Sequence, residues 1–365
     1  MEGIEQALRH CLERDLTFVS FHAQDQVHLW ISLKPELRTL YINDLDAREN
    51  IFIVEPFFNR IDRTYFLQPD LQFDLTKVRF DHTSIEDASG FKGARGTARS
   101  AKLDREEYLK IVVEARESIL YDDLEKVVLS RTLSVPFDRK LLPRLFTRAL
   151  KEQPDAFVCL LNTSEFGTWI GASPERLMQI DGDRLIVDSI AGTLPLNAAP
   201  DDPDHWGSKE REEQEYVTRN VIETLNASGL AGIHVSDRKV LRAAQVAHLH
   251  TRISAPADQI RAASIMKALH PTPAVCGTPR DRALHFIKSH EPHDRSLYTG
   301  FWGPWRWKGS TTLFVNLRCM QLLQAEAILY VGGGITGASD PGKEWAETGH
   351  KALTWLGPLE AIKAE

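Results

Sequence analysis

Apolar residues recur along the chain at two spacings, that of an amphipathic helix and that of a β-strand, and the first hundred residues contain both. Residues 1–16 place apolar side chains at the spacing of an amphipathic helix. Residues 18–33 and 50–58 form short alternating runs that are rich in β-branched and aromatic side chains, which predicts strands. This part of the chain carries no recognisable catalytic or binding motif.

Helical and strand patterns continue to intermix beyond this region. Helical spacing predicts helices at 103–120, 141–152 and 208–229, the last of them closed by Gly229. Short apolar or alternating runs predict strands at 126–137, 156–162, 167–173, 183–196, 239–255, 311–323 and 325–334. A glycine turn and a final helix end the chain. The order does not follow a regular βαβ alternation, and it contains no repeat of solenoid length.

The stretch from 84 to 102 interrupts these patterns. It is rich in Gly, Ala and Ser and has few apolar residues, a composition that is typical of linkers and mobile loops. The sequence leaves two interpretations open, a linker between domains or a surface loop inside one domain. The length of 365 residues leaves the domain count open as well, because sheet-rich enzymes often exceed about 200 residues without splitting.

Composition excludes several classes of protein. A content of 42% hydrophobic and 26% charged residues is typical of a globular protein. No run of about 18 apolar residues is present, and the N-terminus lacks the apolar stretch of a secretory signal, so we expect a cytoplasmic protein without a membrane partner. A net charge of -7 with interspersed signs argues against nucleic acid as a partner. The four cysteines lie far apart without zinc or redox spacing, which predicts buried thiols.

A glycine-rich turn from Gly332 to Gly337 follows the apolar residues 327–331. The turn matches GxGxxG, and its continuation to Lys343 matches GxxxxGK, but both nucleotide-binding patterns lack their context. Only one predicted helix remains for a dinucleotide fold, and Glu344 stands where a phosphate loop needs Ser or Thr. Two interpretations remain, a tight strand-to-helix connection or a backbone that approaches a ligand closely, where exposed N–H groups favour a carboxylate or phosphate.

Acidic residues on two predicted helices are candidates for binding a metal ion. Within 208–229, Glu213 falls on the stripe of apolar side chains, and a carboxylate that faces the core requires a cation or hydrogen-bond donors. On the final helix Glu344, Glu347 and Lys351 share one face, although a solvated helix face has the same pattern. Carboxylates in small number suit Mg²⁺, but the sequence alone does not establish that the two helices meet.

Four further polar residues stand out by their position. Lys126 opens a predicted strand, Glu175 follows a proline in a turn, and His248 and Arg318 each interrupt an apolar strand pattern. Taken singly, Lys126 and Glu175 are typical of surface charges, and a hydrogen-bonded core histidine is the default interpretation of His248. A lysine acts as a base only where burial lowers its pKa from about 10.4. An inward Arg318 requires an anionic partner, and its planar fork matches a carboxylate.

Together these segments resemble the chorismate-utilising family, which includes isochorismate synthases, salicylate synthases and the large subunits of anthranilate and aminodeoxychorismate synthases. The matching segments, in family order, are KVVLSR, GASPERL, SIAGTLP, SKEREEQEYV, HLHTRI, LHPTPAVCGTPR, EPHDRSLYTGFWG, the RC of VNLRCM, GGGIT and EWAETGHK. The resemblance covers about 105–360, whereas 1–104 matches only loosely. It implies an α+β fold in which two large antiparallel-rich sheets pack face to face with helices outside. It also implies a single domain over 1–365, with 1–104 as its divergent N-terminal part and the site in a cleft.

The resemblance also assigns roles to individual residues. Lys126 would be the general base that activates water for attack at C2 of chorismate, and Glu175 would be the acid that protonates the departing C4 hydroxyl. Glu213 and Glu347, with Glu344 nearby, would hold Mg²⁺, which in this family binds the ring carboxylate. The remaining substrate contacts would be Arg318 and the N–H groups around Gly334 for the enolpyruvyl carboxylate, Gly192 and Thr193 for the ring, and His248 and Lys351 as supporting polar groups. A mild departure from the family pattern leaves Glu212 as an alternative ligand, although the stripe argument favours Glu213.

Two residues select among the reactions of the family. The aminating relatives generally lack the lysine found at position 126, so Lys126 favours water over ammonia as the nucleophile. Salicylate synthases keep this lysine but carry Thr where this chain has Ala274, which favours an isochorismate synthase, with a salicylate synthase as the alternative. No segment resembles a fused glutaminase, and we expect no obligatory glutaminase subunit. There are two further alternatives: a catalytically silent subunit on the same fold, and a nucleotide enzyme that uses the glycine turn. The sequence does not determine whether the product would serve the synthesis of menaquinone, a siderophore or salicylate.

Overall fold

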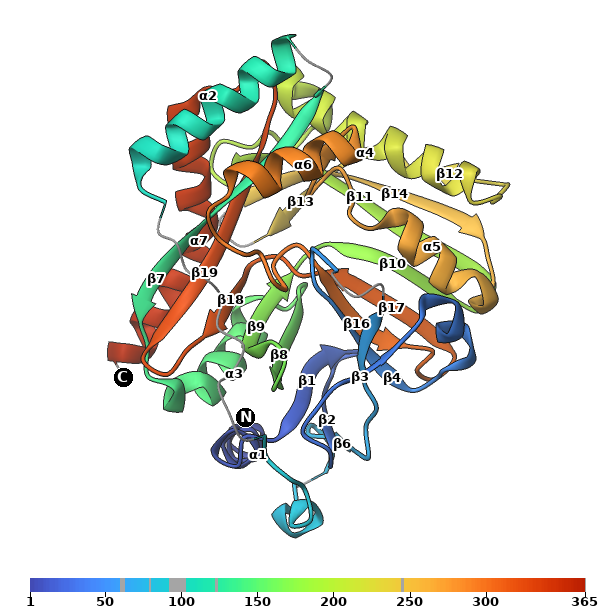
Figure 1. The fold of residues 1–365 in the computed structure, drawn as a ribbon, viewed down its shortest axis with the longest axis vertical. Helices are drawn as coiled ribbons and strands as arrows, with labels where there is room; N and C mark the ends of the chain where they lie inside the picture. Colours follow the sequence, from blue (N-terminus) through green and yellow to red (C-terminus); the bar gives the residue numbers. More distant parts are fainter. Residues whose placement is uncertain (60–62, 79, 92–102, 122–123, 244–245, 365) are drawn as a thin grey trace.

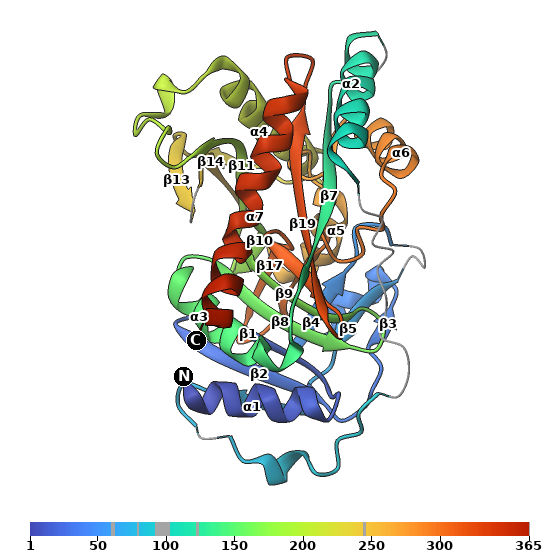
Figure 2. The same ribbon diagram turned by 90° about the vertical axis from the view of Figure 1, so that its left-hand side faces the viewer.

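The computed structural model describes residues 1–59, 63–78, 80–91, 103–121, 124–243 and 246–364. Two large antiparallel sheets dominate it (Figures 1 and 2). The first sheet has nine strands in the order β15-β7-β19-β18-β9-β8-β1-β2-β6. Their bounds, in that order, are Gly277–Thr278, Lys126–Pro136, Glu326–Ile335, Cys319–Leu322, Gly167–Ser173, Phe157–Thr163, Thr17–Ala23, Gln26–Ser32 and Leu71–Asp74.

The second sheet has ten strands. Nine of them follow the order β12-β14-β11-β10-β17-β16-β4-β5-β3, and β13 pairs with β14 beside this path. The bounds of the nine are His234–Val235, Val246–Pro256, Arg184–Pro195, Arg176–Asp181, Ser310–Val315, Phe301–Trp305, Ile51–Glu55, Thr64–Leu67 and Arg38–Leu40, and β13 is Lys239–Ala243.

The helices cover the outer faces of the two sheets. Their bounds are α1 (Glu2–Glu13), α2 (Arg105–Tyr121), α3 (Leu142–Glu152), α4 (Ser208–Ala227), α5 (Ala262–Leu269), α6 (Arg280–His290) and α7 (Pro341–Ala364). On the first sheet α1 and α3 pack beside β1 and β8, α7 lies along β19, and α2 and α6 contact β7. On the second sheet α4 lies across β11 and β14, and α5 packs against β10. The α+β fold with two packed sheets and outer helices, predicted from the resemblance, is therefore confirmed.

Three layers of apolar side chains fix this arrangement. Successive side chains of a strand point to opposite faces, so in β1 Phe18 packs under the helices α1 and α3, whereas Val19 and Phe21 point toward the second sheet. Between the sheets, Trp30 of β2 and Phe52 of β4 belong to the same cluster as Phe21. Central strands such as β8 are buried along their whole length, which explains why their sequences are continuous apolar runs.

Several predicted elements have different boundaries in the structure. The helix predicted at 208–229 is α4, and Gly229 follows its end with a φ of +75°, as expected of a terminating glycine. The single strand predicted at 239–255 is the antiparallel pair of β13 and β14. The single strand predicted at 311–323 is also two strands, but here β17 lies in the second sheet and β18 in the first. The chain therefore crosses between the sheets at residues 316–318.

The stretch predicted as a linker or loop at 84–102 is only partly described, because residues 92–102 lie outside the described residues. Before that point, Ile85 closes a short 3₁₀-helix (His82–Ile85) and is buried against the apolar cluster under α1 and α3. All four cysteines are buried and free, as predicted. In the described part of the chain, no helix combines the length and apolar character needed to cross a membrane.

Candidate active site

Two neighbouring crossovers between the sheets place the most important side chains. Pro174 and Glu175 connect β9 of the first sheet to β10 of the second, and residues 316–318 connect β17 back to β18. The two connections are joined by backbone hydrogen bonds, from Ala172 N to Arg318 O at 3.0 Å and from Val315 N to Glu175 O at 3.1 Å. Arg318 was predicted to interrupt a strand, but it lies in the crossover with a φ of +46°. Both side chains thus lie where the sheets separate.

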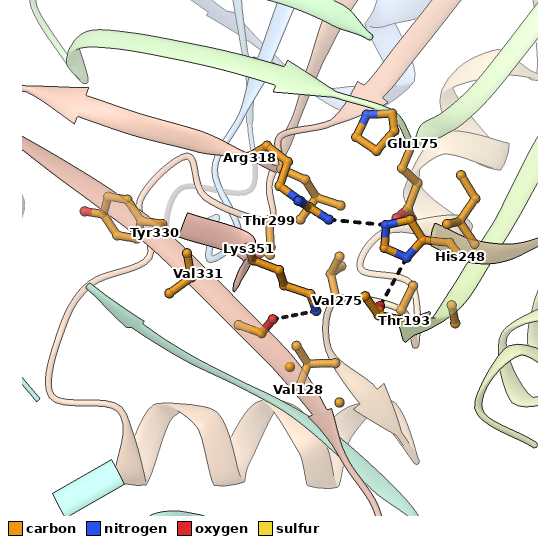
Figure 3. Close-up of a pocket in the computed structure, with 18 of the residues that line it drawn as sticks. Val128, Glu175, Thr193, His248, Val275, Thr299, Arg318, Tyr330, Val331 and Lys351 are labelled. Atoms are coloured by element: carbon orange, nitrogen blue, oxygen red, sulfur yellow. Dashed lines mark hydrogen bonds between the residues drawn. The ribbon is translucent and has the colours of Figure 1, made fainter. Parts of the chain in front are cut away.

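A cleft opens at these crossovers and encloses about 690 Å³ of empty space, part of it continuous with solvent. Eight of the predicted site residues line it: Glu175, Thr193, Glu213, His248, Ala274, Arg318, Gly334 and Lys351. Figure 3 shows Glu175, His248 and Thr193 on one wall, with Lys351 extending into the cavity from the side of Val331. Four predicted residues are not among those that line the cleft: Lys126, Gly192, Glu344 and Glu347.

Lys126 lies behind the cleft wall formed by Gly334. Its side chain is 0% exposed, and its Nζ lies 3.1 Å from Oε1 of Glu213 on α4. A methyl group at position 334 would lie 2.4 Å from that carboxylate oxygen and 3.0 Å from Cε of Lys126. A methyl group would therefore force the carboxylate to shift, and glycine at 334 lets the lysine, the glutamate and the strand meet in this arrangement.

The glycines at 332–334 belong to the strand predicted at 325–334, and they do not form the first part of the turn predicted from Gly332 to Gly337. They are the last part of β19 and pair with Ser130, Leu129 and Val128 of β7. On its other side β19 pairs with β18 only as far as Tyr330, so in the described structure no strand covers the edge beyond it. Residues 331–334 all line the cleft at this open edge. The prediction of close backbone approach is thus realised by a strand edge, which has N–H groups available for an anion.

Glu175 has the properties of a proton donor. Its side chain is 4% exposed. Burial, reinforced by the negative charge of Asp188 and opposed by Lys126, raises the pKa of Glu175 to about 8. The carboxyl group is therefore largely protonated at neutral pH, which is the state that a general acid requires. The influence of Lys126 on this pKa places the lysine and the glutamate in one electrostatic environment.

Arg318 and His248 form a positively charged wall. Arg318 Nη1 donates to Thr354 Oγ1 at 3.0 Å, and its Nη2 lies 3.2 Å from His248 Nε2. Because a guanidinium only donates, Nε2 accepts, and Nδ1 of His248 carries a proton toward Thr193 Oγ1 at 3.1 Å. Burial, together with Arg318 and Lys351, holds the pKa of His248 well below its ordinary value, so the ring is neutral.

Arg318 keeps its charge in this setting. Burial lowers the pKa of Arg318 to about 10, which leaves it protonated at neutral pH. Among the described residues no carboxylate pairs with it, and a buried cation without an anionic partner is costly. The unpaired guanidinium beside an open strand edge therefore favours binding of an anion, and its shape suits a carboxylate.

The three predicted metal ligands lie around Gly333 and Gly334, and each is paired with a lysine. Glu213 pairs with Lys126 at 3.1 Å, Glu344 with Lys209 at 2.7 Å and Glu347 with Lys351 at 2.8 Å. A methyl group at Gly333 would lie 3.4 Å from Oε2 of Glu344 and 3.7 Å from Oε1 of Glu347. Two helices that are distant in sequence, α4 and α7, thus bring their carboxylates to one place.

The hydrogen bonds and charges around these carboxylates indicate whether they could hold a metal ion. In the described part of the chain no group of three ligands is spaced as a metal site, and each of the three carboxylates is paired with a lysine. Oε2 of Glu344 is buried without a hydrogen-bond partner of ordinary geometry, although Ser339 interacts with the carboxyl group. Burial, followed by the charge of Glu347, raises the pKa of Glu344, against the effect of Lys209. A buried oxygen within a set of hard carboxylate donors fits a small divalent cation.

The positions of Glu212 and Glu213 differ in the structure. Glu212 is exposed to solvent, whereas Glu213 faces the cleft. Burial alone would raise the pKa of Glu213, but Lys126 and Lys351 bring it below its ordinary value. The stripe buried against the sheet contains Gln214 with the apolar side chains of α4, so Glu213 lies beside that stripe and not on it.

Gly192 supports the cleft from behind. It forms a bulge in β11 with a φ of +68°. A methyl group there would lie 2.6 Å from the carbonyl oxygen of Glu210. Gly192 therefore lets α4 approach the sheet closely and thereby positions Glu213, but it does not line the cleft as predicted.

Sequence reasoning missed several residues of the site. Tyr298 and Thr299 line the cleft, Lys209 neutralises Glu344, and Asp188 raises the pKa of Glu175. Tyr298, Thr299 and Lys209 fall inside segments that carry the family resemblance, so their segments were recognised but their roles were not. Asp188 gave no signal, because its effect depends on the packing of β11 near the crossover.

Comparison with known proteins identifies the family. The family described as "Chorismate binding enzyme" matches residues 71–360. The chain belongs to this family. The match begins well before residue 105, where the resemblance in the sequence motifs begins.

Individual relatives within this family catalyse different reactions. The chain is 30% identical over 272 residues to isochorismate synthase EntC of Escherichia coli K12, which covers 71% of this chain and 68% of the relative. It is 31% identical to the salicylate biosynthesis isochorismate synthase of Pseudomonas aeruginosa, over 74% of this chain and 58% of the relative. It is also 30% identical to anthranilate synthase component 1 of Pseudomonas putida, over 73% of this chain and 55% of the relative. These similarities therefore give the family and not the reaction.

Solved structures of the family share the fold. The putative 2,3-dihydroxybenzoate-specific isochorismate synthase DhbC of Bacillus anthracis matches with a TM-score of 0.75 and 24% identity, over 98% of this chain and 99% of the other. MenF, the menaquinone-specific isochorismate synthase of Escherichia coli, matches with a TM-score of 0.76 and 22% identity, over 97% and 91%. At these identities the likeness concerns the fold.

Proposed function

We propose that the protein is an isochorismate synthase, which converts chorismate to isochorismate by adding water at C2 and releasing the C4 hydroxyl. The observation that carries the proposal is a largely protonated Glu175 in the cleft, with Lys126 buried beside Gly334 of the cleft wall and close enough to influence the pKa of Glu175. Similarity to isochorismate synthases at about 30% identity supports it further.

The chemistry needs one base and one acid on opposite sides of the ring. Lys126 takes a proton from water as the new C2–O bond forms, and Glu175 gives a proton to the C4 hydroxyl as the C4–O bond breaks. Water is both consumed and released, so the net reaction is an isomerisation. Hydroxide is a poor leaving group, and this is why the raised pKa of Glu175 matters.

The walls of the cleft suit a substrate with two carboxylates. Arg318 and the open edge of β19 around Gly334 bind the enolpyruvyl carboxylate, and Thr193 lies beside the ring. His248 is neutral and positions the side chains of Arg318 and Thr193 by its two hydrogen bonds. Lys351, which donates to Gly332 O at 2.9 Å, adds positive charge on the same side.

Magnesium is the proposed cofactor, held by Glu213 and Glu347 with Glu344 in support. When bound, the ion would neutralise these carboxylates and supply a Lewis acid for the ring carboxylate. The buried oxygen of Glu344 and the convergence of α4 and α7 support this assignment.

A salicylate synthase is the alternative within the family, because it shares the lysine base but goes on to eliminate pyruvate. Ala274 at the cleft wall favours the isomerase. The presence of Lys126 disfavours an aminating enzyme with a glutaminase partner. A single domain over 1–365, with 1–104 as its N-terminal part, and a cytoplasmic location are further proposals that accompany this function.

Product analysis tests the proposal directly. Purified protein is incubated with chorismate, with and without Mg²⁺, and the products are separated by chromatography. We expect isochorismate, formed only with Mg²⁺, and salicylate plus pyruvate as main products would establish the alternative instead. Lys126→Ala should abolish turnover and keep chorismate binding largely intact, whereas Lys140→Ala, an exposed lysine outside the cleft, should match the wild type. Activity that survived in Lys126→Ala would reject the assigned base.

A further inference from the structure

A second cavity lies between β4, β5, β16 and the end of α5, near the right side of Figure 1. It encloses about 630 Å³ of empty space, part of it open to solvent. Its lining residues are Ile42, Glu55, Asn59, Arg63, Thr64, Met266, Lys267, His270 and Phe301. None of these residues lines the active-site cleft. The proposed reaction makes no use of this cavity.

Glu55 is an unsatisfied acid inside the cavity. It is 7% exposed, its Oε1 accepts a hydrogen bond from Asn59, and the hydroxyl of Thr64 also contacts the carboxyl group. Its Oε2 is buried without a partner. Among the described residues no cation pairs with it, and burial raises the pKa of Glu55 to about 7. A carboxylate in this position gains most from a ligand that supplies a positive charge and a donor.

His270 lines the same cavity. Its ring nitrogens are buried, and backbone hydrogen bonds with Phe57 and Pro56 act on the ring. Burial, followed by the charge of Arg280, lowers the pKa of His270 to about 3, so the ring is neutral and one nitrogen accepts. Its ring lies 4.9 Å from that of Phe301, and Phe301 pairs with Glu55 across β16 and β4. The acid, the histidine and the aromatic ring therefore surround one space.

We propose that this cavity is a second small-molecule site, which binds a protonated primary amine with an apolar body. The ammonium group has three donors, and the carboxyl group of Glu55 can accept one of them in a charge-assisted hydrogen bond. Ile42, Met266 and Phe301 supply the apolar wall for the rest of the ligand. Arg63 and Lys267 also line the cavity, but the guanidinium of Arg63 stacks on the ring of Tyr41 and Lys267 is exposed to solvent. A neutral alcohol would leave the charge of Glu55 uncompensated.

The cavity is connected to the active-site cleft through the chain. His270 precedes Ala274 and Val275 by a few residues, and Phe301 follows Thr299 closely. Ala274, Val275 and Thr299 all line the cleft. A ligand that orders His270 and Phe301 is therefore expected to change the turnover of chorismate, and this part of the inference rests on the proposed function.

Calorimetric titration with 2-phenylethylamine tests the binding site, with 2-phenylethanol as the uncharged probe. We expect saturable binding of the amine and not of the alcohol by the wild type. Glu55→Gln keeps the shape of the side chain and should weaken amine binding at least about tenfold, the loss of a hydrogen bond to a charged group. Lys267→Ala removes an exposed charge at the rim and should bind the amine at least as well as the wild type.

The outcomes separate the proposal from its rivals. The proposal is overturned if the wild type shows no saturable binding of the amine. It is also overturned if the alcohol binds equally well or if Glu55→Gln keeps its affinity, because the cavity would then bind apolar molecules without using the charge of Glu55. Because Glu55 is buried, a second variant guards against misfolding: Ile42→Trp narrows the cavity from its half-buried side and should also weaken amine binding.

Turnover measurements test the connection to the active site. With chorismate as substrate, the amine should change kcat/KM at least about twofold in the wild type and not in Glu55→Gln. Unchanged turnover in an active enzyme that binds the amine would reject the connection. Amine binding by a protein that does not convert chorismate would instead keep the second site and reject the proposed function.

Discussion

Replacing Glu175 with Gln removes the proposed acid and preserves its size. The side chain is buried at the crossover between β9 and β10, so the amide occupies the same space without a proton to donate. A positioned general acid contributes about 100- to 10,000-fold to a rate, and we expect kcat to fall within this range while chorismate still binds. In the wild type, kcat should fall as the pH rises through about 8, because the carboxyl group then loses its proton.

The same substitution should change stability in a direction fixed by the pKa. Glu175 has an ordinary pKa of 4.5 and a folded-state pKa of about 8, so between these values the folded protein holds a proton that the unfolded chain releases. The stability associated with this group is fully present below pH 4.5 and is lost as the pH rises to about 8. At about 1.4 kcal/mol for each tenfold change in proton affinity, the loss approaches an upper limit of about 5 kcal/mol. Glu175→Gln should lack this loss and unfold at higher denaturant concentration than the wild type at pH 8.

Two measurements check the reasoning. Steady-state rates from pH 6 to about 9 give the alkaline limb of kcat, and denaturant unfolding at the same pH values gives the stability. Glu165→Gln is the matched control, because burial also raises the pKa of Glu165 but this residue lies outside the cleft. The control should leave kcat unchanged. A Glu175→Gln variant that retains wild-type kcat, or a wild-type kcat that does not fall on the alkaline side, would refute the role of Glu175 as acid.

Three further substitutions test other parts of the site. Gly334→Ala should lower kcat at least about tenfold and reduce the free energy of unfolding by about 1–3 kcal/mol through overpacking. The reason is that its methyl group would lie 2.4 Å from a carboxylate oxygen. Gly333→Ala is the control, because its nearest atom lies at 3.4 Å, and it should have only a small effect on kcat and on the free energy of unfolding. Glu213→Gln should weaken Mg²⁺ binding measured by calorimetry, whereas the exposed Glu215→Gln should not, and equal affinities would exclude Glu213 as a ligand. Arg318→Lys should raise KM for chorismate by about 10-fold or more through loss of the planar fork with a smaller effect on kcat, and an unchanged KM would remove Arg318 from the carboxylate site.

The sequence predicted those elements whose pattern is local. The amphipathic spacing of 1–16 and 208–229 corresponds to α1 and α4, and the alternating pattern of 126–137 corresponds to β7. These segments bury one face or stripe against a neighbour, so tertiary contacts strengthen the pattern that the residues already show. The fold class came from the family resemblance, and the sheet orders of the structure agree with it.

The sequence misled where tertiary contacts decide the conformation. Gly332 to Gly334 were predicted both as the end of a strand and as the start of a turn, because glycine usually marks a turn. In the structure they belong to the strand, where Gly334 leaves room for Lys126 and Glu213. The apolar pattern of 311–323 continues on both sides of a crossover and is broken there only by Asn316 and Arg318, since residues buried between two sheets are apolar whichever sheet they belong to. The metal ligands could be named from their helices, but the lysine that pairs with each of them could be found only in the structure.

The position of the crossovers explains why this fold has its cleft there. Where β9 leads into β10 and β17 returns to β18, the chain leaves one sheet for the other, and β18 ends before it covers the last residues of β19. The free strand edge, the buried acid and the buried guanidinium all result from this one irregularity. If the chain stayed in one sheet at these points, the edge of β19 would be covered, and Glu175 and Arg318 would have no space in the interior. The reactive groups of the site are therefore positioned by the topology of the sheets, and the outer helices α4 and α7 add the carboxylates that complete it.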